Sequence, residues 1–248
     1  MPTYVYGVTN AANVVRSRSG IDGGEPRVLS GEELHALVGS VPDDTVEANR
    51  ENLLAHSDVV QDAVEAGPVV PMRFGMVFAD DDAVRSELMV RRRSELAAVL
   101  DRIRDAVELT VKAYYDQDAV LSEIVAGNPT IRRLQASTRA LAGDAGYYER
   151  IRLGELVAKA VGSQRERDAA ALVDRLRSGA LDVEVTAEVP ERMVTKAAFL
   201  VPRNAVDKFR DRVDELAAEQ AGRMSVTLVG PLPPYSFVAL TRAEGAAV

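Results

Sequence analysis

The sequence predicts an α+β protein of two lobes, and three observations carry this prediction. Runs of β-branched residues with a period of two occur near both ends of the 248-residue chain. Between them, residues 118–178 keep the helical period throughout. Glycine and proline separate the segments, as expected where turns join strands and helices. A chain of this length suits two small units better than one large one.

The N-terminal lobe is predicted to begin with two strands. The β-rich run 4–9 predicts the first strand, and the polar, glycine-rich residues 10–26 predict a loop. Residues 34–39 alternate in character, which predicts a second strand. Glu32 and Glu33, just before this run, equally allow a short helix.

Two helices and two more strands complete this lobe. Apolar stripes predict one helix from the turn at 42–45 to about Gly67, and another from residues 80–82 to about Arg104. The three acids at 80–82 are stabilised by unpaired amides at a helix start, with a metal site as the sharper alternative. Residues 107–115 alternate again as a last strand. The order strand, strand, helix, strand, helix, strand predicts a ferredoxin-like sandwich.

The strand between the two helices, residues 69–78, has two unlike faces. At a period of two its even-numbered residues form a continuous apolar face, and Arg73 lies on the other face between Pro71 and Gly75. Pro71 cannot donate to a ladder, so the strand is expected to be an edge, a strand beginning or a bulge. Gly75 permits a bend or a close backbone approach.

The middle of the chain is predicted to be helical, with breaks at Asn128-Pro129 and at the glycines of 143–146. One helix over 147–176 would be about 45 Å long, which exceeds the width of a small domain. A bend near Gly162 or a protruding helical hairpin is therefore expected.

The last part of the chain returns to β structure. Alternating residues predict a strand over 183–189, and a more apolar run predicts a central strand over 194–201. A further strand is predicted over 224–229, with a helix between the last two strands. The predicted domains are a ferredoxin-like N-terminal domain, 1–116, and a second part, 117–248. That second part consists of a helical segment, 117–180, and an α+β C-terminal domain, 181–248.

Composition limits the classes of partner and compartment. A net charge of −8 and a pI near 5.0 argue against nucleic acid as a partner, and the basic run at 91–93 falls in a helical pattern, which favours a solvated face. The absence of cysteine excludes disulfides and thiol chemistry. No signal peptide and no apolar run of ~20 residues are present, so a cytoplasmic protein without membrane insertion is expected.

The inventory of catalytic groups is small. His35 lies in the weakly predicted second strand, where a surface role is favoured. His56 lies one turn from Leu53 and Val60, at the margin of the apolar stripe, and a hydrogen-bonded structural histidine is favoured over a catalytic one. Two histidines on different elements, without cysteine, make no zinc site. The phosphate-binding and nucleophile-elbow motifs are absent, so catalysis and a cofactor are not expected.

Surface residues offer the alternative to catalysis. Tyr235 and Phe237 lie on a segment stiffened by Pro231, Pro233 and Pro234, where they either anchor a partner or close the core. Arg73 also has two interpretations, one within the chain and one toward a partner. It either pairs with an acid within the chain or reaches an acidic partner.

Taken together, residues 70–78 (VPMRFGMVF) and 230–238 (GPLPPYSFV) resemble the two most recognisable blocks of the GvpL/GvpF gas vesicle protein family. Residues 53–60 resemble the family's helix with its histidine upstream of the first block. Residues 153–157 and 198–201 also fit in order, so the resemblance covers nearly the whole chain. One departure is Leu232, where an aromatic residue is common in the family.

The resemblance implies a non-enzymatic accessory protein of gas vesicles, with two α+β lobes and no cofactor. It implies contacts with the shell protein GvpA and other accessory Gvp proteins, in assembly or as a minor shell component. The candidate interaction or motif residues are His56, Pro71, Arg73, Phe74, Gly75, Pro234, Tyr235 and Phe237. Two other hypotheses are a small-molecule-sensing regulator, by analogy with ferredoxin-like lobes, and a cofactor-free enzyme using His56 with Arg73.

Overall fold

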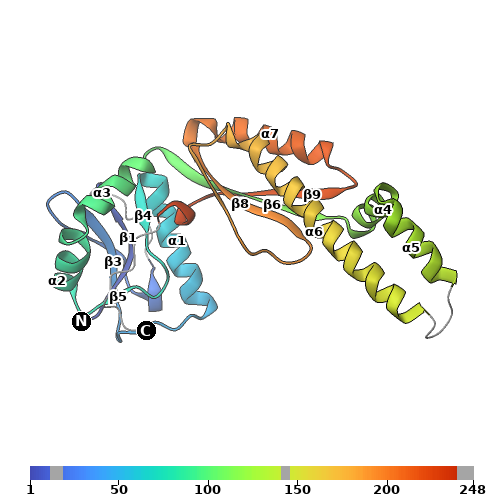
Figure 1. Cartoon of the computed structure of the whole chain (residues 1–248). Helices are drawn as coiled ribbons and strands as arrows, with labels where there is room; N and C mark the ends of the chain where they lie inside the picture. Colours follow the sequence, from blue (N-terminus) through green and yellow to red (C-terminus); the bar gives the residue numbers. More distant parts are fainter. Residues whose placement is uncertain (12–18, 141–145, 239–248) are drawn as a thin grey trace. The chain divides into compact units, whose positions relative to one another are not determined.

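The computed structural model describes residues 1–11, 19–140 and 146–238 (Figure 1). The chain divides into two compact units, and both are discontinuous in sequence. The first unit consists of Met1–Glu108, Leu200–Arg203 and the segment from Gly230 onward. The second consists of Leu109–Phe199 and Asn204–Val229. Within the described residues, no helix is long and apolar enough to cross a membrane.

The first unit contains a five-stranded antiparallel sheet of order β2-β3-β1-β4, with β5 also paired to β1. Its central strand β1 is buried at all seven positions because both faces of the sheet are covered. The predicted strand at 34–39 is confirmed as β3, whereas β2 was not predicted. The strands are β1 (Thr3–Thr9), β2 (Arg27–Ser30), β3 (His35–Ser40), β4 (Val69–Pro71) and β5 (Val77–Phe78).

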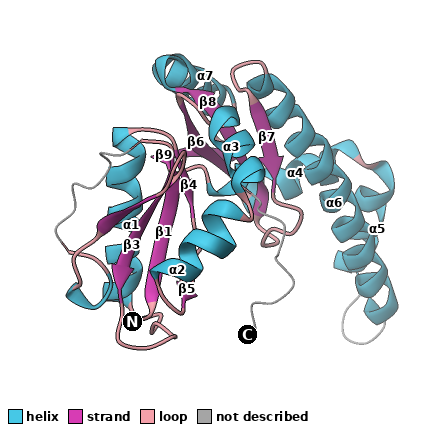
Figure 2. Ribbon diagram, turned by 90° about the vertical axis from the view of Figure 1, so that its left-hand side faces the viewer, coloured by secondary structure: helices cyan, strands magenta, loops and turns pink. Residues whose placement is uncertain are grey.

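Helices cover the two faces of this sheet (Figures 1 and 2). On one face lies α1 (Arg50–Ala66), capped by Asn49, whose Oδ1 accepts from the amide of Asn52 at 2.8 Å. On the other face lie α2 (Asp81–Ala83), the π-helical segment η2 (Val84–Val90) and α3 (Arg93–Arg102). The single-turn η1 (Ile21–Gly23) contacts α1.

The acids at 80–82 begin a helix, as predicted. The Asp80 carboxylate accepts from the amide of Ala83 at 2.8 Å. Asp81 accepts from Arg27 at 2.7 Å and from the Thr3 hydroxyl at 2.8 Å, and the hydrogen bond from Arg27 lowers the pKa of Asp81. In the described residues no His, Asp or Glu cluster suited to a metal ion occurs. Asp80 therefore caps the helix, and Asp81 joins it to Arg27 and Thr3.

The prediction of a single strand over 69–78 is wrong. The segment pairs with β1 twice, as β4 and β5, and a turn at Phe74-Gly75 separates the two strands. Gly75 has φ +87°, and a Cβ there would meet nothing within 4 Å, so it provides the bend and no close approach. Val69 and Val70 are both buried, so the two-faced alternation also fails. The edge position of β4, which ends at Pro71, is confirmed.

In its described residues, the second unit combines a four-stranded sheet, of order β7-β8-β6-β9, with four α-helices. The strands are β6 (Ala106–Tyr115), β7 (Asp182–Val185), β8 (Met193–Pro202) and β9 (Met224–Leu232). The helices are α4 (Gln117–Gly127), α5 (Pro129–Ala140), α6 (Tyr147–Arg177) and α7 (Val206–Glu219). The helical turn η4 (Arg203–Ala205) follows β8, and the turn η5 (Tyr235–Phe237), which belongs to the first unit, follows β9.

Of the two forms predicted for the long helix α6, a bend or a helical hairpin, the structure shows the hairpin. α6 is one α-helix of 31 residues, and its N-terminal part pairs with α5 as a hairpin (Figure 1). Its buried residues, Leu172, Val173 and Leu176, lie near its C-terminal end. The predicted bend near Gly162 is not present.

A charged network joins this unit's sheet to its helices. Arg223, at the start of β9, donates to Glu123 of α4 at 2.7 Å and to Asp168 of α6 at 2.6 Å. The Tyr115 hydroxyl of β6 donates to the same Asp168. Burial raises the pKa of Asp168, but the hydrogen bonds from Arg223, Tyr115 and Gln164 outweigh burial and lower this pKa overall.

Two predicted domain assignments need correction. The strand predicted at 107–115 exists, but it lies in the second sheet between β8 and β9 instead of closing the N-terminal one. Residues 230–238 belong to the first unit instead of the C-terminal domain, because Ser236 and Tyr235 bond to Glu108 and His56 there. The α+β class with two lobes is confirmed, and the ferredoxin-like type stays a prediction.

Candidate interaction site around His56

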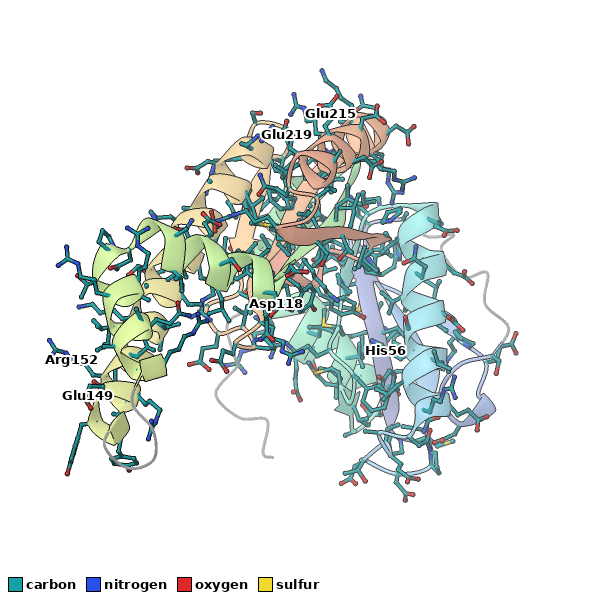
Figure 3. All side chains as sticks on the ribbon, turned by 90° about the vertical axis from the view of Figure 1, so that its right-hand side faces the viewer. His56, Asp118, Glu149, Arg152, Glu215 and Glu219 are labelled. Carbon is teal, nitrogen blue, oxygen red and sulfur yellow. The ribbon has the colours of Figure 1, made fainter. Side chains whose placement is uncertain are left out.

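His56 lies on the buried face of α1 (Figure 3). The apolar residues Val59, Val60, Ala63 and Val64 place this face against the sheet, and His56 precedes Val60 by one helical turn on the same side. Only 5% of His56 is exposed. A buried imidazole needs partners for its ring nitrogens, so its surroundings are informative.

Both ring nitrogens of His56 bond to tyrosine hydroxyls. Nδ1 lies 2.8 Å from the Tyr4 hydroxyl of β1, and Nε2 lies 2.9 Å from the Tyr235 hydroxyl of η5. The Tyr4 oxygen also accepts from the amide of Gly75 at 3.2 Å. This chain of bonds joins α1, β1, the turn at Gly75 and the C-terminal segment.

Aromatic rings enclose the imidazole. The Tyr6 ring stacks on it with centroids 5.8 Å apart and 27° between the planes. The rings of Tyr4 and Phe74 meet it edge-on at 5.7 and 5.8 Å. Tyr4 and Tyr6 reach the same face because side chains two apart in a strand point the same way. We call these five residues, His56 with Tyr4, Tyr6, Phe74 and Tyr235, the aromatic cluster.

The aromatic cluster is uncharged at neutral pH. Burial lowers the pKa of His56 to about 4, against an opposing contribution from the Met72 carbonyl. Burial also raises the pKa of Tyr4 and raises the pKa of Tyr235 to about 12. A neutral imidazole donates from one nitrogen and accepts at the other, and the two hydroxyls can serve both needs. No ring nitrogen remains for proton transfer, which argues against His56 as a catalytic base.

The C-terminal segment is partly core and partly surface. Phe237 is buried, and Ser236 donates from its amide at 2.9 Å and from its hydroxyl at 3.0 Å to the buried carboxylate of Glu108. Tyr235, in contrast, is 39% exposed while its hydroxyl reaches His56. Phe237 therefore closes the core, whereas the anchoring of a partner by Tyr235 stays a prediction.

Arg73 is the exposed cation of this region. Among the described residues it forms no ion pair and no hydrogen bond, so the predicted internal pairing is not found. It immediately precedes Phe74 of the aromatic cluster, which fixes its backbone near the site.

A cleft lies at the C-terminal end of α1 in the same unit. Its volume is about 200 Å³, and the Arg203 guanidinium at its rim donates to the carbonyl of Val64. Pro234, one of the candidate residues predicted from the sequence, is buried and lines this cleft.

Comparison with known families decides the classification. Residues 2–239 match the model of the family described as gas vesicle synthesis protein GvpL/GvpF. The chain belongs to the GvpL/GvpF family. It is therefore a gas vesicle-related protein, and the resemblance seen in the two sequence blocks is confirmed.

Relatives of both types within the GvpL/GvpF family are similar over their full length. Gas vesicle protein F of Streptomyces sp. (strain CB03234) is 39% identical over 245 residues, covering 96% of this chain and 100% of that protein. Gas vesicle protein L of the same organism is 29% identical, covering 97% and 94%. The crystal structure of GvpF from Anabaena sp. PCC7120 matches with a TM-score of 0.85 at 22% identity, covering 97% and 99%. This structural match supports the α+β fold.

The two GvpL/GvpF sequence blocks meet at the aromatic cluster. Of the candidate residues, His56, Phe74, Gly75 and Tyr235 come together there, whereas Phe237 lies in the core and Pro71 ends β4. Tyr4, Tyr6, Glu108 and Ser236 were not predicted from the sequence. The available signal was the Tyr-Val-Tyr alternation of β1, which puts two hydroxyls on one face.

Proposed function

We propose that this chain is a non-enzymatic gas vesicle accessory protein that contacts the shell protein GvpA and supports vesicle assembly, remaining as a minor shell-associated component. Its membership in the GvpL/GvpF family supports the gas vesicle context. The contact itself is inferred from the geometry of the first unit.

The observation that carries the proposal is the convergence of both sequence blocks on buried His56. This arrangement holds Phe74 and the partly exposed Tyr235 in fixed positions, with Arg73 exposed beside Phe74. Tyrosine and arginine dominate binding hot spots, and fixing them before binding reduces the entropy lost on association. The exposed parts of Arg73, Phe74 and Tyr235 are therefore the proposed contact surface.

The same proposal covers the wider set of partners. Other accessory Gvp proteins are expected to join the complex in the cytoplasm, at the growing vesicle. Nucleic acid is not expected, since the net charge is −8. Leu232, half-buried at the end of β9, lies outside the proposed contact surface, so the loss of an aromatic residue there is expected to matter little.

Ligand sensing is not favoured as the function. The cleft at the end of α1, at about 200 Å³, is smaller than the roughly 300–1,000 Å³ typical of small-molecule sites. Its guanidinium, Arg203, is already bonded to a backbone carbonyl.

Co-purification with the shell protein tests the proposal. A tagged full-length chain is expected to retain GvpA from cells that make vesicles, and deletion of the chain is expected to disturb vesicle formation. A chain that retains no Gvp protein, with normal vesicles after its deletion, would overturn the proposal.

A further inference from the structure

A buried carboxylate holds Ser236, the serine of the second sequence block. The Ser236 amide donates to Oε2 of Glu108 at 2.9 Å, and the Ser236 hydroxyl donates to Oε1 at 3.0 Å. Only 6% of Glu108 is exposed, and burying a carboxylate is costly unless hydrogen bonds satisfy it. Two bonds from one carboxylate to one residue fix the orientation of that residue as well as its position.

The turn η5 transmits this hold to the residues on either side of Ser236. The amide of Tyr235 donates to the carbonyl of Pro233 at 2.8 Å. The amide of Phe237 donates to the carbonyl of Pro234 at 3.0 Å. Both prolines also restrict the backbone, because their rings fix φ. A backbone restrained in this way cannot turn Tyr235 without also moving Ser236.

Tyr235 is consequently held at two points. Its hydroxyl lies 2.9 Å from Nε2 of His56, and its backbone is held by Glu108 through the neighbouring Ser236. Its side chain is nevertheless partly exposed, at 39%. A bond at the hydroxyl alone leaves the ring free to swing about that bond. Both points are therefore needed to give the exposed part of the ring one orientation.

We propose that Glu108 is a positioning residue for the contact surface, which fixes Tyr235 in the orientation that binds the partner by holding Ser236. The effect on binding rests on the proposed function, because Glu108 acts through the contact of Tyr235 with GvpA. The positioning itself is a property of the free chain. Fixing a side chain before binding removes an ordering cost of about 0.5–1.5 kcal/mol, so its loss is expected to weaken binding several-fold.

Amide exchange in the free chain tests the positioning. Residues 230–238 contain three prolines, which carry no amide hydrogen, so a peptide that covers them reports on few amides, including that of Ser236. Glu108→Gln replaces one acceptor oxygen by a donor, and exchange in this segment is expected to become about tenfold faster. Ser236→Ala removes only the hydroxyl bond and is expected to accelerate exchange roughly threefold. Exchange in α1 is expected to stay unchanged in both variants.

Asp80→Ala is the matched control for the exchange experiment. The Asp80 carboxylate also holds a backbone amide, that of Ala83 at 2.8 Å, but it does so at the start of α2. Its loss is expected to leave exchange in residues 230–238 unchanged. Unchanged exchange of this segment in both Glu108→Gln and Ser236→Ala would overturn the proposal.

Binding of purified GvpA separates positioning from a merely structural role. Glu108→Gln is expected to weaken the affinity about fivefold, whereas Asp80→Ala leaves it unchanged. In a chain that already carries Tyr235→Ala, Glu108→Gln is expected to cause no further loss, because the side chain that it positions is absent. A general structural defect instead predicts the same loss in both backgrounds.

Equal losses in the two backgrounds, or an unchanged affinity of Glu108→Gln, would overturn the proposal. Failure of the proposed function gives a different result, since the unmodified chain would then bind no GvpA. Exchange in residues 230–238 would in that case still decide whether Glu108 positions Tyr235.

Discussion

At the scale of single residues, His56 connects the two sequence blocks. The sequence placed it at the margin of an apolar stripe and favoured a structural role, which agrees with its burial and its two tyrosine bonds. Its partners could not be predicted, because Tyr4 lies 52 positions and Tyr235 lies 179 positions away in the chain. Periodicity reports which face of an element is buried and not what that face meets.

Replacing His56 tests its structural role. His56→Ala removes the partner of two hydroxyls and leaves a cavity among aromatic rings, so the free energy of unfolding should fall by about 2–4 kcal/mol. Urea denaturation followed by circular dichroism measures this loss. His35→Ala is the matched control, because His35 is half-buried and its Nδ1 has no hydrogen-bond partner in the described structure, so its loss should be below about 1 kcal/mol. Equal losses for the two variants would contradict the assigned role.

The pH dependence of stability follows from the same residue. The pKa of His56 is about 4 in the folded chain, below the ~6.5 of an unfolded histidine, so the unfolded state binds more protons between these values. The contribution of neutral His56 to the free energy of unfolding is fully present above pH 6.5. It decreases by on the order of 3 kcal/mol as the pH falls toward 4. His56→Gln lacks this titration. The stability difference between the unmodified chain and His56→Gln should therefore shrink from pH 7 to pH 4, and a constant difference would contradict the shifted pKa.

At the scale of elements, local signals predicted helices well and the segment 69–78 poorly. Caps, breaks and apolar stripes predicted α1, α4, α5 and α6, because these signals act within a few residues. The segment 69–78 reads as one strand by composition, yet the turn at Gly75 divides it. That division depends on pairing with β1, which no local pattern encodes.

Two glycine substitutions should have opposite effects. Gly75→Ala forces a side chain into φ +87° and should destabilise the chain by about 1–2 kcal/mol, although the space around it is open. Gly162→Ala, inside α6 and equally open, should stabilise its unit by about 0.5–1 kcal/mol through helix propensity. Chemical denaturation measures both. A neutral or stabilising Gly75→Ala would show that the turn does not require glycine.

At the scale of the whole molecule, the class was predictable and the assignment of segments to units was not. The run at 107–115 looks like the natural close of the N-terminal lobe, but its neighbours β8 and β9 lie about 80 or more positions later in the chain. The segment from Gly230 returns to the first unit for a similar reason, since its partners are His56 and Glu108. Long-range pairing decides both assignments, and only the resemblance of the two blocks hinted that they belong together.

If the two blocks present one surface to the shell protein, as we propose, changes to that surface should weaken the affinity of the purified chain for GvpA. Arg73→Glu and Tyr235→Ala alter the exposed groups of the two blocks, while Arg91→Glu reverses an exposed charge elsewhere in the same unit as a control. Each of the first two variants should weaken binding about tenfold or more, with the control unchanged. If both variants bind GvpA as tightly as Arg91→Glu does, the proposed surface is wrong.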